Sequence, residues 1–296
     1  MKRIGIVGLG DMGIGMAKNV LQSGRELVGY DLRTERVEML EALGGTAAAS
    51  VQEVGQGSDA VFVMVLNGAQ VEEVITGPDG LLESMTPGST ILITATIAPQ
   101  EVRSIAPAVN SAGIGLMDAP VSGGKSGAEA GTLTMMVATP KEIFDANQNV
   151  LTAVGEQIFH VGEEPGLGQT VKAALQAFIG TSFAAVFESL ALGAAAGVPG
   201  KTLYEVFGAS GVSSPLFKNC AKLIMDRAFV GTGSHIGTMY KDLGISMGMA
   251  KEAGAAMFTT AAAYELFRAG ISRFPEEDNW SCVKLLERIT GTEVTW

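Results

Sequence analysis

Short apolar runs alternate with amphipathic stretches in the first half of the chain. Six of these runs are often β-branched and are bounded by Gly, Pro or Asp, which is typical of strands. They occupy residues 3–9, 26–31, 60–66, 90–96, 115–121 and 132–138. Helical patterns lie between them, among others at 11–24 and 34–44. The alternation predicts βαβ units around a parallel sheet that is covered on both faces.

The pattern changes at the segment EEPGLGQ, which begins at residue 163, and no strand-like run follows it. A long helix is expected at about 170–197. Its apolar residues occupy nearly the whole circumference, so we expect it to be buried between domains or subunits. The predicted fold is α/β: an N-terminal Rossmann-like doubly wound domain (1–163), then an all-α C-terminal domain (164–296) that includes the long interdomain helix.

Composition narrows the classes of partner. The 296 residues are 47% hydrophobic and 17% charged, which is a globular composition. A net charge of −11 without a Lys/Arg cluster argues against nucleic acid. The most apolar segment, 173–187, is shorter than the roughly 20 residues a bilayer requires, so no membrane partner is expected. Cys220 and Cys282 form no disulfide framework and the N-terminus lacks a signal peptide, which indicates a cytoplasmic protein.

A glycine-rich motif follows the first predicted strand and opens the first predicted helix. It matches GxGxxG and comprises Gly8, Leu9, Gly10, Asp11, Met12 and Gly13. In a dinucleotide-binding fold, the glycines make the turn, admit the pyrophosphate and let helix and strand pack. The next strand ends in Asp31, which would bind ribose hydroxyls and repel a 2′-phosphate. Arg33 could instead hold that phosphate, so NAD is the expected cofactor and NADP the second choice.

A second glycine-rich segment follows the predicted strand that contains Asp118. The strand runs into Ser122, Gly123 and Gly124. Consecutive backbone N–H groups beside a hydroxyl suit a carboxylate ligand. On this spacing alone, a plain glycine turn between strands is equally consistent. No metal is expected, because His160 and His235 are far apart and no other metal-ligand spacing occurs.

Four blocks together resemble the β-hydroxyacid dehydrogenase family. They are GLGDMGIGMAKNVLQSG (8–24), DAPVSGGKSGAEAGTLTMMV (118–137), GLGQTVKAALQ (166–176) and KDLGI (241–245). The resemblance implies an oxidoreductase that acts on CH–OH groups with NAD or NADP. It also implies an active site between the Rossmann-like and helical domains, a small carboxylate substrate, and a homodimer or homotetramer.

The resemblance assigns roles to individual residues. Lys172 matches the catalytic lysine of the family. Burying a lysine in an apolar helix costs desolvation free energy, which favours a functional role for it. The positions that match cofactor-lining residues are Val65, Leu66, Asn67, Thr96 and Lys241. The positions that match substrate-binding residues are Ser122, Gly123, Gly124 and Gln176.

Gln176 departs from the Asn found in members similar to 3-hydroxyisobutyrate dehydrogenase. Residues four apart share a helix face, so Gln176 should lie on the face of Lys172. In this respect, and in segments 66–74 and 278–287, the chain is similar to the branch that acts on L-threonate. We therefore expect hydride transfer to or from a small hydroxy acid, first a four-carbon sugar acid such as L-threonate. The alternatives are 3-hydroxyisobutyrate or tartronate semialdehyde as substrate, and a non-catalytic dinucleotide-binding protein.

Overall fold

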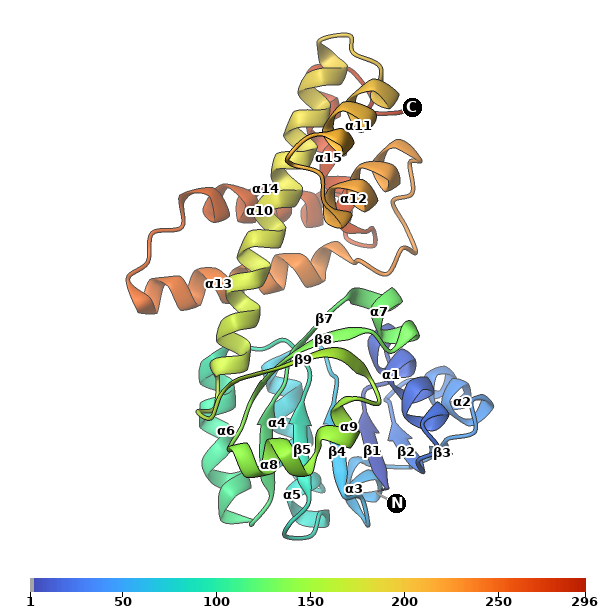
Figure 1. The fold of residues 1–296 in the computed structure, drawn as a ribbon, viewed down its shortest axis with the longest axis vertical. Helices are drawn as coiled ribbons and strands as arrows, with labels where there is room; N and C mark the ends of the chain where they lie inside the picture. The colour runs from blue at the N-terminus through green and yellow to red at the C-terminus, as the bar shows by residue number, and fades with distance from the viewer. Residues whose placement is uncertain (1–2) are drawn as a thin grey trace. The chain divides into compact units, whose positions relative to one another are not determined.

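The structure, a computed structural model, describes residues 3–296. Contacts divide the chain into two compact units, of which the first ends at Lys172 and the second comprises Ala173–Trp296. Figure 1 traces both units along the chain. The division falls within one long helix, α10 (Leu167–Ala195), so each unit contains part of that helix.

The first unit is built on one nine-stranded sheet. Its strands are β1 (Ile4–Val7), β2 (Leu27–Tyr30), β3 (Thr46–Ala47), β4 (Ala60–Val63), β5 (Thr90–Ile93), β6 (Gly115–Asp118), β7 (Val121–Ser122), β8 (Leu133–Ala138) and β9 (Gly155–Gly162). The order is β3-β2-β1-β4-β5-β6-β8-β7, with β9 paired to β8. The strands from β3 to β6 are parallel, and β8 is antiparallel to β6. In such a sheet, ligands bind at the carboxyl ends of the strands where the order reverses, here between β1 and β4.

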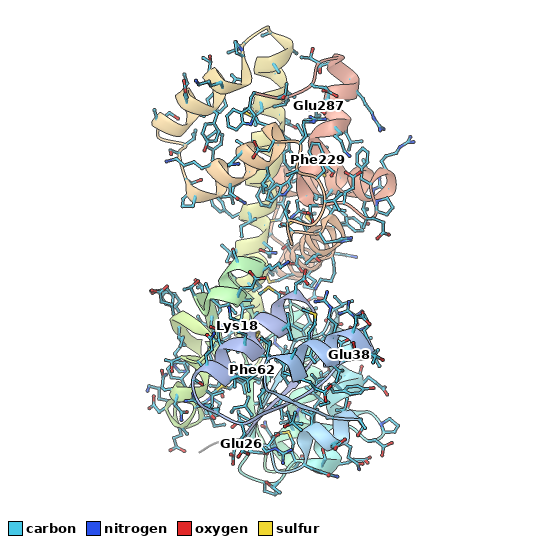
Figure 2. The ribbon with its side chains drawn as sticks, turned by 90° about the vertical axis from the view of Figure 1, so that its right-hand side faces the viewer. Lys18, Glu26, Glu38, Phe62, Phe229 and Glu287 are labelled. Atoms are coloured by element: carbon cyan, nitrogen blue, oxygen red, sulfur yellow. The ribbon has the colours of Figure 1, made fainter. Side chains whose placement is uncertain are left out.

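Helices cover both faces of this sheet. They are α1 (Asp11–Gln22), α2 (Thr34–Ala42), α3 (Val51–Gly55), α4 (Gly68–Thr76), α5 (Leu81–Ser84), α6 (Pro99–Ser111), α7 (Gly124–Ala130), α8 (Lys141–Ala146) and α9 (Gln148–Leu151). Alternate residues of β4 enter two separate cores, because Phe62 packs with α1 whereas Val61 and Val63 pack with α4 and α6. Phe62, labelled in Figure 2, is fully buried. The predicted doubly wound α/β architecture is confirmed.

The six strands predicted from the apolar runs are present as β1, β2, β4, β5, β6 and β8. The helices expected at 11–24 and 34–44 are α1 and α2, and each ends two residues sooner. Three strands were not predicted. β3 and β7 have only two residues each, and β9 reads GEQIFHVG, in which polar residues interrupt the apolar pattern. β9 is partly exposed, so it lacks the continuous apolar run of a strand covered on both faces.

The second unit is helical. Besides part of α10 it contains α11 (Gly200–Ala209), α12 (Pro215–Met225), α13 (Ile236–Ala253), α14 (Phe258–Arg273), the 3₁₀-helix η1 (Asn279–Cys282) and α15 (Val283–Thr290). Its core is rich in Phe, and Trp280 packs edge-on against Phe183 with ring centres 5.2 Å apart. Residues 173–296 contain no strand, as predicted, apart from an isolated bridge between His235 and Asp278.

The long helix α10 starts three residues before its predicted position, and its 29 residues extend for about 43 Å. Phe178 and Leu192 are 71% and 72% exposed on it. These two positions of the helix are therefore exposed, although its apolar circumference predicted burial. By length and composition alone, α10 is also the one helix of residues 3–296 able to cross a membrane, a test that core helices of soluble proteins also pass.

Candidate active site

The glycine loop between β1 and α1 leaves open backbone where a diphosphate would lie. Gly8 has a φ of +94°, and a Cβ atom there would lie 2.3 Å from the carbonyl oxygen of Met64. A Cβ atom on Gly13 would lie 1.9 Å from the carbonyl oxygen of Gly8. A Cβ atom on Gly10 would meet only the Arg33 guanidinium, at 3.8 Å. Protein packing requires the first and third glycines, whereas the space over Gly10 fits the pyrophosphate of a dinucleotide.

Asp31, directly after β2, binds both the glycine loop and its own neighbour. Its Oδ2 accepts a hydrogen bond from the backbone N–H of Leu9 (2.7 Å). Its Oδ1 accepts from the backbone N–H (2.9 Å) and the Nε (3.2 Å) of Arg33. Burial raises the pKa of Asp31, but these hydrogen bonds outweigh burial and the net pKa is lowered. A charged carboxylate paired with Arg33 favours ribose hydroxyls at this strand end and disfavours a 2′-phosphate.

The other residues of the motif lie in the first turn of α1 or beneath it. Leu9 is fully buried, and Met12 packs partly buried against the same core. Asp11 forms an ion pair with Arg36, at 3.1 Å. Arg36 thereby offsets a negative charge that would otherwise oppose a phosphate at this helix N-terminus.

Two neighbouring strand ends carry further predicted cofactor residues. After β4, Val65 is half-buried and Leu66 is 72% exposed. Asn67 caps α4, because its Oδ1 accepts from the backbone N–H of Gln70 (2.9 Å). After β5, Thr96 is half-buried. Since β1, β4 and β5 are adjacent and parallel, these segments lie at the same edge of the sheet as the glycine loop.

The Ser122–Gly124 loop joins β7 to α7, and α7 packs against α1. Its two glycines have φ of +131° and +60°. Gly15 of α1 approaches α7 so closely that a Cβ atom there would lie 2.8 Å from the carbonyl carbon of Ala128. Asn19 Nδ2 donates to the carbonyl oxygen of Ala128 (2.7 Å), across 109 residues of sequence. The helices that follow the two predicted glycine-rich segments therefore pack against each other.

Lys172 lies on the second turn of α10 and is 6% exposed. The first turn of α10, which precedes Lys172, is held by Asp118 and Gln169. Neither was among the predicted site residues. Asp118 is fully buried at the end of β6, and its Oδ2 accepts from the backbone N–H of Gln169 (3.1 Å). Burial raises the pKa of Asp118 to about 6, against the opposing effect of this hydrogen bond. The signal was present in the sequence, since both residues belong to the blocks DAPVSGG and GLGQ.

In the second unit, Asp242 of α13 brings Gln176 and Lys241 together. Asp242 is buried, and its Oδ2 accepts from Nε2 of Gln176 (2.5 Å). Its Oδ1 lies 3.2 Å from Nζ of Lys241, an ion pair without hydrogen-bond geometry, so this oxygen has no hydrogen-bond partner among residues 3–296. Ser246, one turn further along α13, donates to the carbonyl oxygen of Ala173 (2.7 Å) and ties α13 to α10.

The segment 278–287 supports the helix that carries this pair. Asp278 Oδ2 accepts from the backbone N–H (2.7 Å) and the hydroxyl (2.8 Å) of Thr232. Trp280 Nε1 donates to the same hydroxyl (2.9 Å), and Asn279 Nδ2 donates to the Ser234 hydroxyl (2.8 Å). These bonds hold the loop that leads into α13, which gives the segment a structural role.

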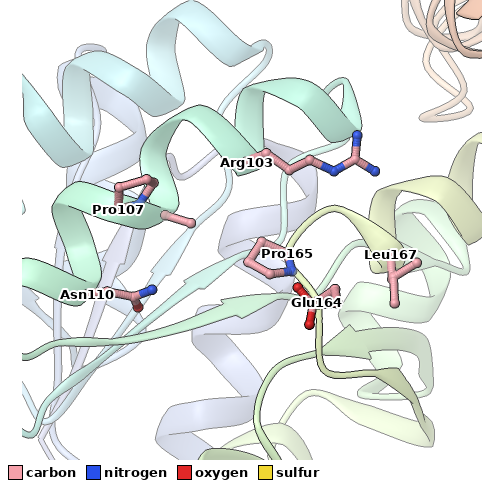
Figure 3. A pocket seen from close by; sticks show the side chains of 7 residues that line it. Arg103, Pro107, Asn110, Glu164, Pro165 and Leu167 are labelled. Carbon is pink, nitrogen blue, oxygen red and sulfur yellow. The ribbon is translucent and has the colours of Figure 1, made fainter.

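An open pocket of about 640 Å³ lies away from these residues, between α6 and the loop before α10. Figure 3 shows Arg103, Pro107, Asn110, Glu164, Pro165 and Leu167 around it. None of the predicted site residues lines it, so its size does not make it the active site.

The histidines have structural environments. His160 stacks on Phe144 with ring centres 4.7 Å apart, and His235 caps α13 by accepting from the backbone N–H of Gly237 (3.0 Å). Within residues 3–296, no group of three or more His, Cys, Asp and Glu side chains could hold a metal ion. The candidate residues therefore form two groups: the strand-end loops and Lys172 in the first unit, and the Gln176–Asp242–Lys241 cluster in the second.

Comparison with known proteins identifies the protein family to which the chain is similar. Residues 3–162 match the family model described as the NAD binding domain of 6-phosphogluconate dehydrogenase. Residues 166–286 match the model described as NAD-binding of NADP-dependent 3-hydroxyisobutyrate dehydrogenase. The chain is 35% identical over 295 residues to 2-(hydroxymethyl)glutarate dehydrogenase of Eubacterium barkeri, covering 99% of this chain and 97% of that one.

Two further matches have the same extent. The chain is 31% identical over 289 residues to L-threonate dehydrogenase of Haemophilus influenzae, covering 97% of this chain and 96% of that one. A crystal structure described as 3-hydroxyisobutyrate dehydrogenase from Salmonella typhimurium matches with a TM-score of 0.89 and 32% identity. That match covers 96% of this chain and 100% of the other.

The fold and the glycine loop define a dinucleotide-dependent oxidoreductase. The matches along the whole chain make the class specific: the chain belongs to the β-hydroxyacid dehydrogenase family. It acts on the CH–OH group of a hydroxy acid, and its cofactor is NAD. The family resemblance, the reaction class and the cofactor predicted from sequence are confirmed. The roles of individual site residues stay predictions.

Proposed function

We propose that this dehydrogenase oxidises a small hydroxy acid with a further hydroxyl group, such as the four-carbon sugar acid L-threonate. The observation that carries the proposal is the hydrogen bond from Gln176 to Asp242. Gln176 lies one helical turn from Lys172 on α10, and both side chains are buried. Family membership supplies the reaction, and this amide distinguishes among substrates.

The carboxylate of Asp242 orders the Gln176 amide. An amide donates through its nitrogen and accepts through its oxygen, whereas an ion-paired carboxylate only accepts. Nε2 must therefore face Asp242, which leaves Oε1 to meet a substrate on this helix face. A substrate hydroxyl would satisfy that oxygen, whereas a methyl group would leave it unpaired at a cost of about 1–3 kcal/mol. This favours a polyhydroxy acid over 3-hydroxyisobutyrate.

We assign the proton transfer to Lys172. When bound, NAD would supply the acceptor for the hydride of the hydroxyl-bearing carbon of the substrate. The hydroxyl proton passes to the amine of Lys172, so the substrate becomes a carbonyl compound without forming a free alkoxide. In the reverse direction the lysine returns this proton to the carbonyl oxygen.

The substrate carboxylate is assigned to the Ser122–Gly124 loop. A Cβ atom on Gly124 would have no neighbour within 4 Å, so a ligand could approach the backbone closely. Consecutive N–H groups in such a turn attract anions. Because the chain has a net charge of −11, the attraction for an anionic substrate must come from local groups such as the backbone N–H groups of this loop.

The relatives support the class and differ in their substrates. One is named for L-threonate and another for 2-(hydroxymethyl)glutarate, at 31% and 35% identity. Both substrates are hydroxy acids, and only L-threonate has several neighbouring hydroxyl groups. The identities alone do not separate them, so the choice here rests on the Gln176 amide.

A substrate panel tests the proposal. Purified protein and NAD are mixed in turn with L-threonate, 3-hydroxyisobutyrate and 2-(hydroxymethyl)glutarate, and NADH formation is followed; tartronate semialdehyde is tested with NADH. We expect the largest kcat/KM with L-threonate, at least about 10-fold above 3-hydroxyisobutyrate, from one hydrogen bond. A preference for 3-hydroxyisobutyrate would contradict the amide argument. No turnover of any of them would favour a non-catalytic dinucleotide-binding protein.

We also propose that the chain forms a homodimer or homotetramer through α10. Phe178 and Leu192 are two heptads apart, so they share one exposed face of the helix. Exposed apolar residues in line are typical of an interface. Light scattering after gel filtration should give a dimer or tetramer mass, reduced in Phe178→Glu and Leu192→Glu. A monomeric wild-type protein would contradict this.

We further infer a cytoplasmic location. Cys220 and Cys282 are both free and buried. Burial raises the pKa of the Cys282 thiol to about 12, so it has little thiolate character. Inert free thiols are typical of proteins in a reducing compartment.

A further inference from the structure

The side chain of Gln169 connects the first turn of α10 to the segment after β5 through two hydrogen bonds. Gln169 is 1% exposed. Its Nε2 donates to the carbonyl oxygen of Ala95 (2.9 Å), and its Oε1 accepts from the backbone N–H of Ile97 (3.1 Å). The two bonds therefore bracket Thr96, the strand-end residue predicted to line the cofactor. Both polar atoms of the amide are bonded to backbone.

The same turn is also held against β6 and β8. The backbone N–H of Gln169 donates to Oδ2 of Asp118, at 3.1 Å. Gly168 leaves no space, since a Cβ atom there would lie 2.5 Å from the carbonyl oxygen of Asp118 and 2.6 Å from that of Met136. A carboxylate at a helix N-terminus also interacts favourably with the helix dipole. The start of α10 cannot slide or rotate without breaking these contacts.

We infer that Gln169 is a positioning residue for hydride transfer. Lys172 follows it by three residues, so the two lie on one helix face a turn apart. Gln169 thereby sets the distance between Lys172 and the Thr96 segment, and so the geometry of the groups that exchange proton and hydride. This inference rests on the catalytic role proposed above for Lys172.

The expected signature is a loss of rate without a loss of binding. A misplacement of about 1 Å in a reacting geometry can cost about 100-fold in rate. Both polar atoms of the Gln169 amide are hydrogen-bonded to the backbone, and the side chain is buried. Its replacement should therefore lower kcat and leave the affinity for NAD and substrate unchanged. A role in stability alone would change neither kcat nor the isotope effect of the folded enzyme.

Gln169→Met is the main variant, because Met has a similar length but forms neither hydrogen bond. We expect kcat to fall about 10- to 100-fold, the primary deuterium isotope effect on kcat to rise, and KM and the NADH dissociation constant to stay within about 2-fold. Thr170→Ala is the matched control, since it removes a hydrogen bond to Gly166 (2.8 Å) in the same turn without touching the Thr96 segment. Equal effects of the two variants, or an unchanged kcat in Gln169→Met, would overturn the inference.

Gln169→Glu supplies a rescue experiment. A protonated Glu reproduces both hydrogen bonds, whereas an ionised Glu places a second acceptor against the carbonyl oxygen of Ala95. The kcat of this variant relative to wild type should therefore rise as the pH falls. The charged groups around this turn are Asp118 on β6, Lys172 on α10, Arg103 on α6 and Glu164 in the loop before α10, and all are present in both proteins. A ratio that stays constant with pH would contradict a hydrogen-bonding role.

Hydrogen exchange tests the inference without any substrate. In Gln169→Met, the amides of residues 95–98 and 167–172 should lose protection together, whereas Thr170→Ala should affect α10 alone. If the wild-type protein oxidised none of the hydroxy acids, the proposed function would fail while this exchange result still reported on the Gln169 contacts. Unchanged protection at residues 95–98 would overturn the inference whatever the substrate.

Discussion

Two buried glutamines lie on one face of α10, on either side of Lys172, and they are bonded differently. Gln169 bonds both polar atoms of its amide to the backbone at the end of β5. Gln176 bonds its Nε2 to Asp242, which directs Oε1 elsewhere. A saturated amide can only hold structure, whereas an amide with one directed oxygen can recognise a ligand. The same residue type is therefore suited to positioning at Gln169 and to recognition at Gln176, which are the roles proposed for them.

Each glutamine has a buried aspartate beside it, and these differ as well. Asp118 faces the first turn of α10, and burial raises its pKa to about 6. Asp242 has a cation, Lys241, at 3.2 Å. A buried carboxylate without a cation is stabilised mainly by helix N–H groups, whereas a paired one can orient two side chains at once. The comparison leads to three predictions.

The largest effect is expected at Asp118. The folded protein binds the Asp118 proton more tightly than the unfolded chain, because burial raises its pKa from 3.8 to about 6. Its contribution to stability is therefore complete only below about pH 3 and is lost as the pH rises through about 6, a change of about 3 kcal/mol. Asp118→Asn cannot ionise. Urea unfolding should show the variant gaining about 3 kcal/mol relative to wild type between about pH 3 and pH 7.

A difference between variant and wild type that does not change with pH would contradict this account of Asp118. Asn keeps an oxygen for the Gln169 backbone N–H, so the hydrogen bond at the start of α10 should survive the substitution. The experiment therefore separates the charge of Asp118 from its hydrogen bond to the helix.

The next effect is expected at Gln176. Gln176→Leu removes the directed oxygen, so kcat/KM for L-threonate should fall about 10- to 100-fold, or about 1.4–2.7 kcal/mol. The value for 3-hydroxyisobutyrate should change less than about 3-fold, because its methyl group cannot donate to that oxygen. Initial rates with both substrates give the ratio. Equal losses for the two substrates would show that Gln176 does not read the extra hydroxyl.

The smallest effect is expected at Asp31, away from α10. Asp31→Ser removes the carboxylate that binds Arg33 and frees the guanidinium for a 2′-phosphate. The ratio of kcat/KM for NADP to that for NAD should rise about 10-fold, or about 1.4 kcal/mol. Adding Arg33→Ala should cancel the gain. A ratio that the first substitution leaves unchanged would contradict the role assigned to this ion pair.

Local patterns predicted much of the fold, and long-range pairs did not follow from them. Local sequence predicted the strand at Ile4–Val7 from its uninterrupted apolar run. It predicted the glycine loop from the GxGxxG motif. The strand Gly155–Gly162 was missed because its partial exposure removes the apolar run. The Gln169–Ala95 and Gln176–Asp242 hydrogen bonds join residues 74 and 66 positions apart. Such pairs depend on how the elements pack in three dimensions, which local sequence patterns do not show. The sequence therefore indicated Lys172 and Gln176 as candidates, but not what orients them.

The most direct test concerns Lys172 itself. Single-turnover measurements follow NADH formation by wild type and Lys172→Ala with NAD and the best substrate of the panel, beside the dissociation constant for NADH. The account predicts that the hydride-transfer rate falls about 100- to 10,000-fold in Lys172→Ala, because the variant lacks the general base. The dissociation constant for NADH should stay within about 3-fold. Undiminished single turnover in Lys172→Ala would contradict the account.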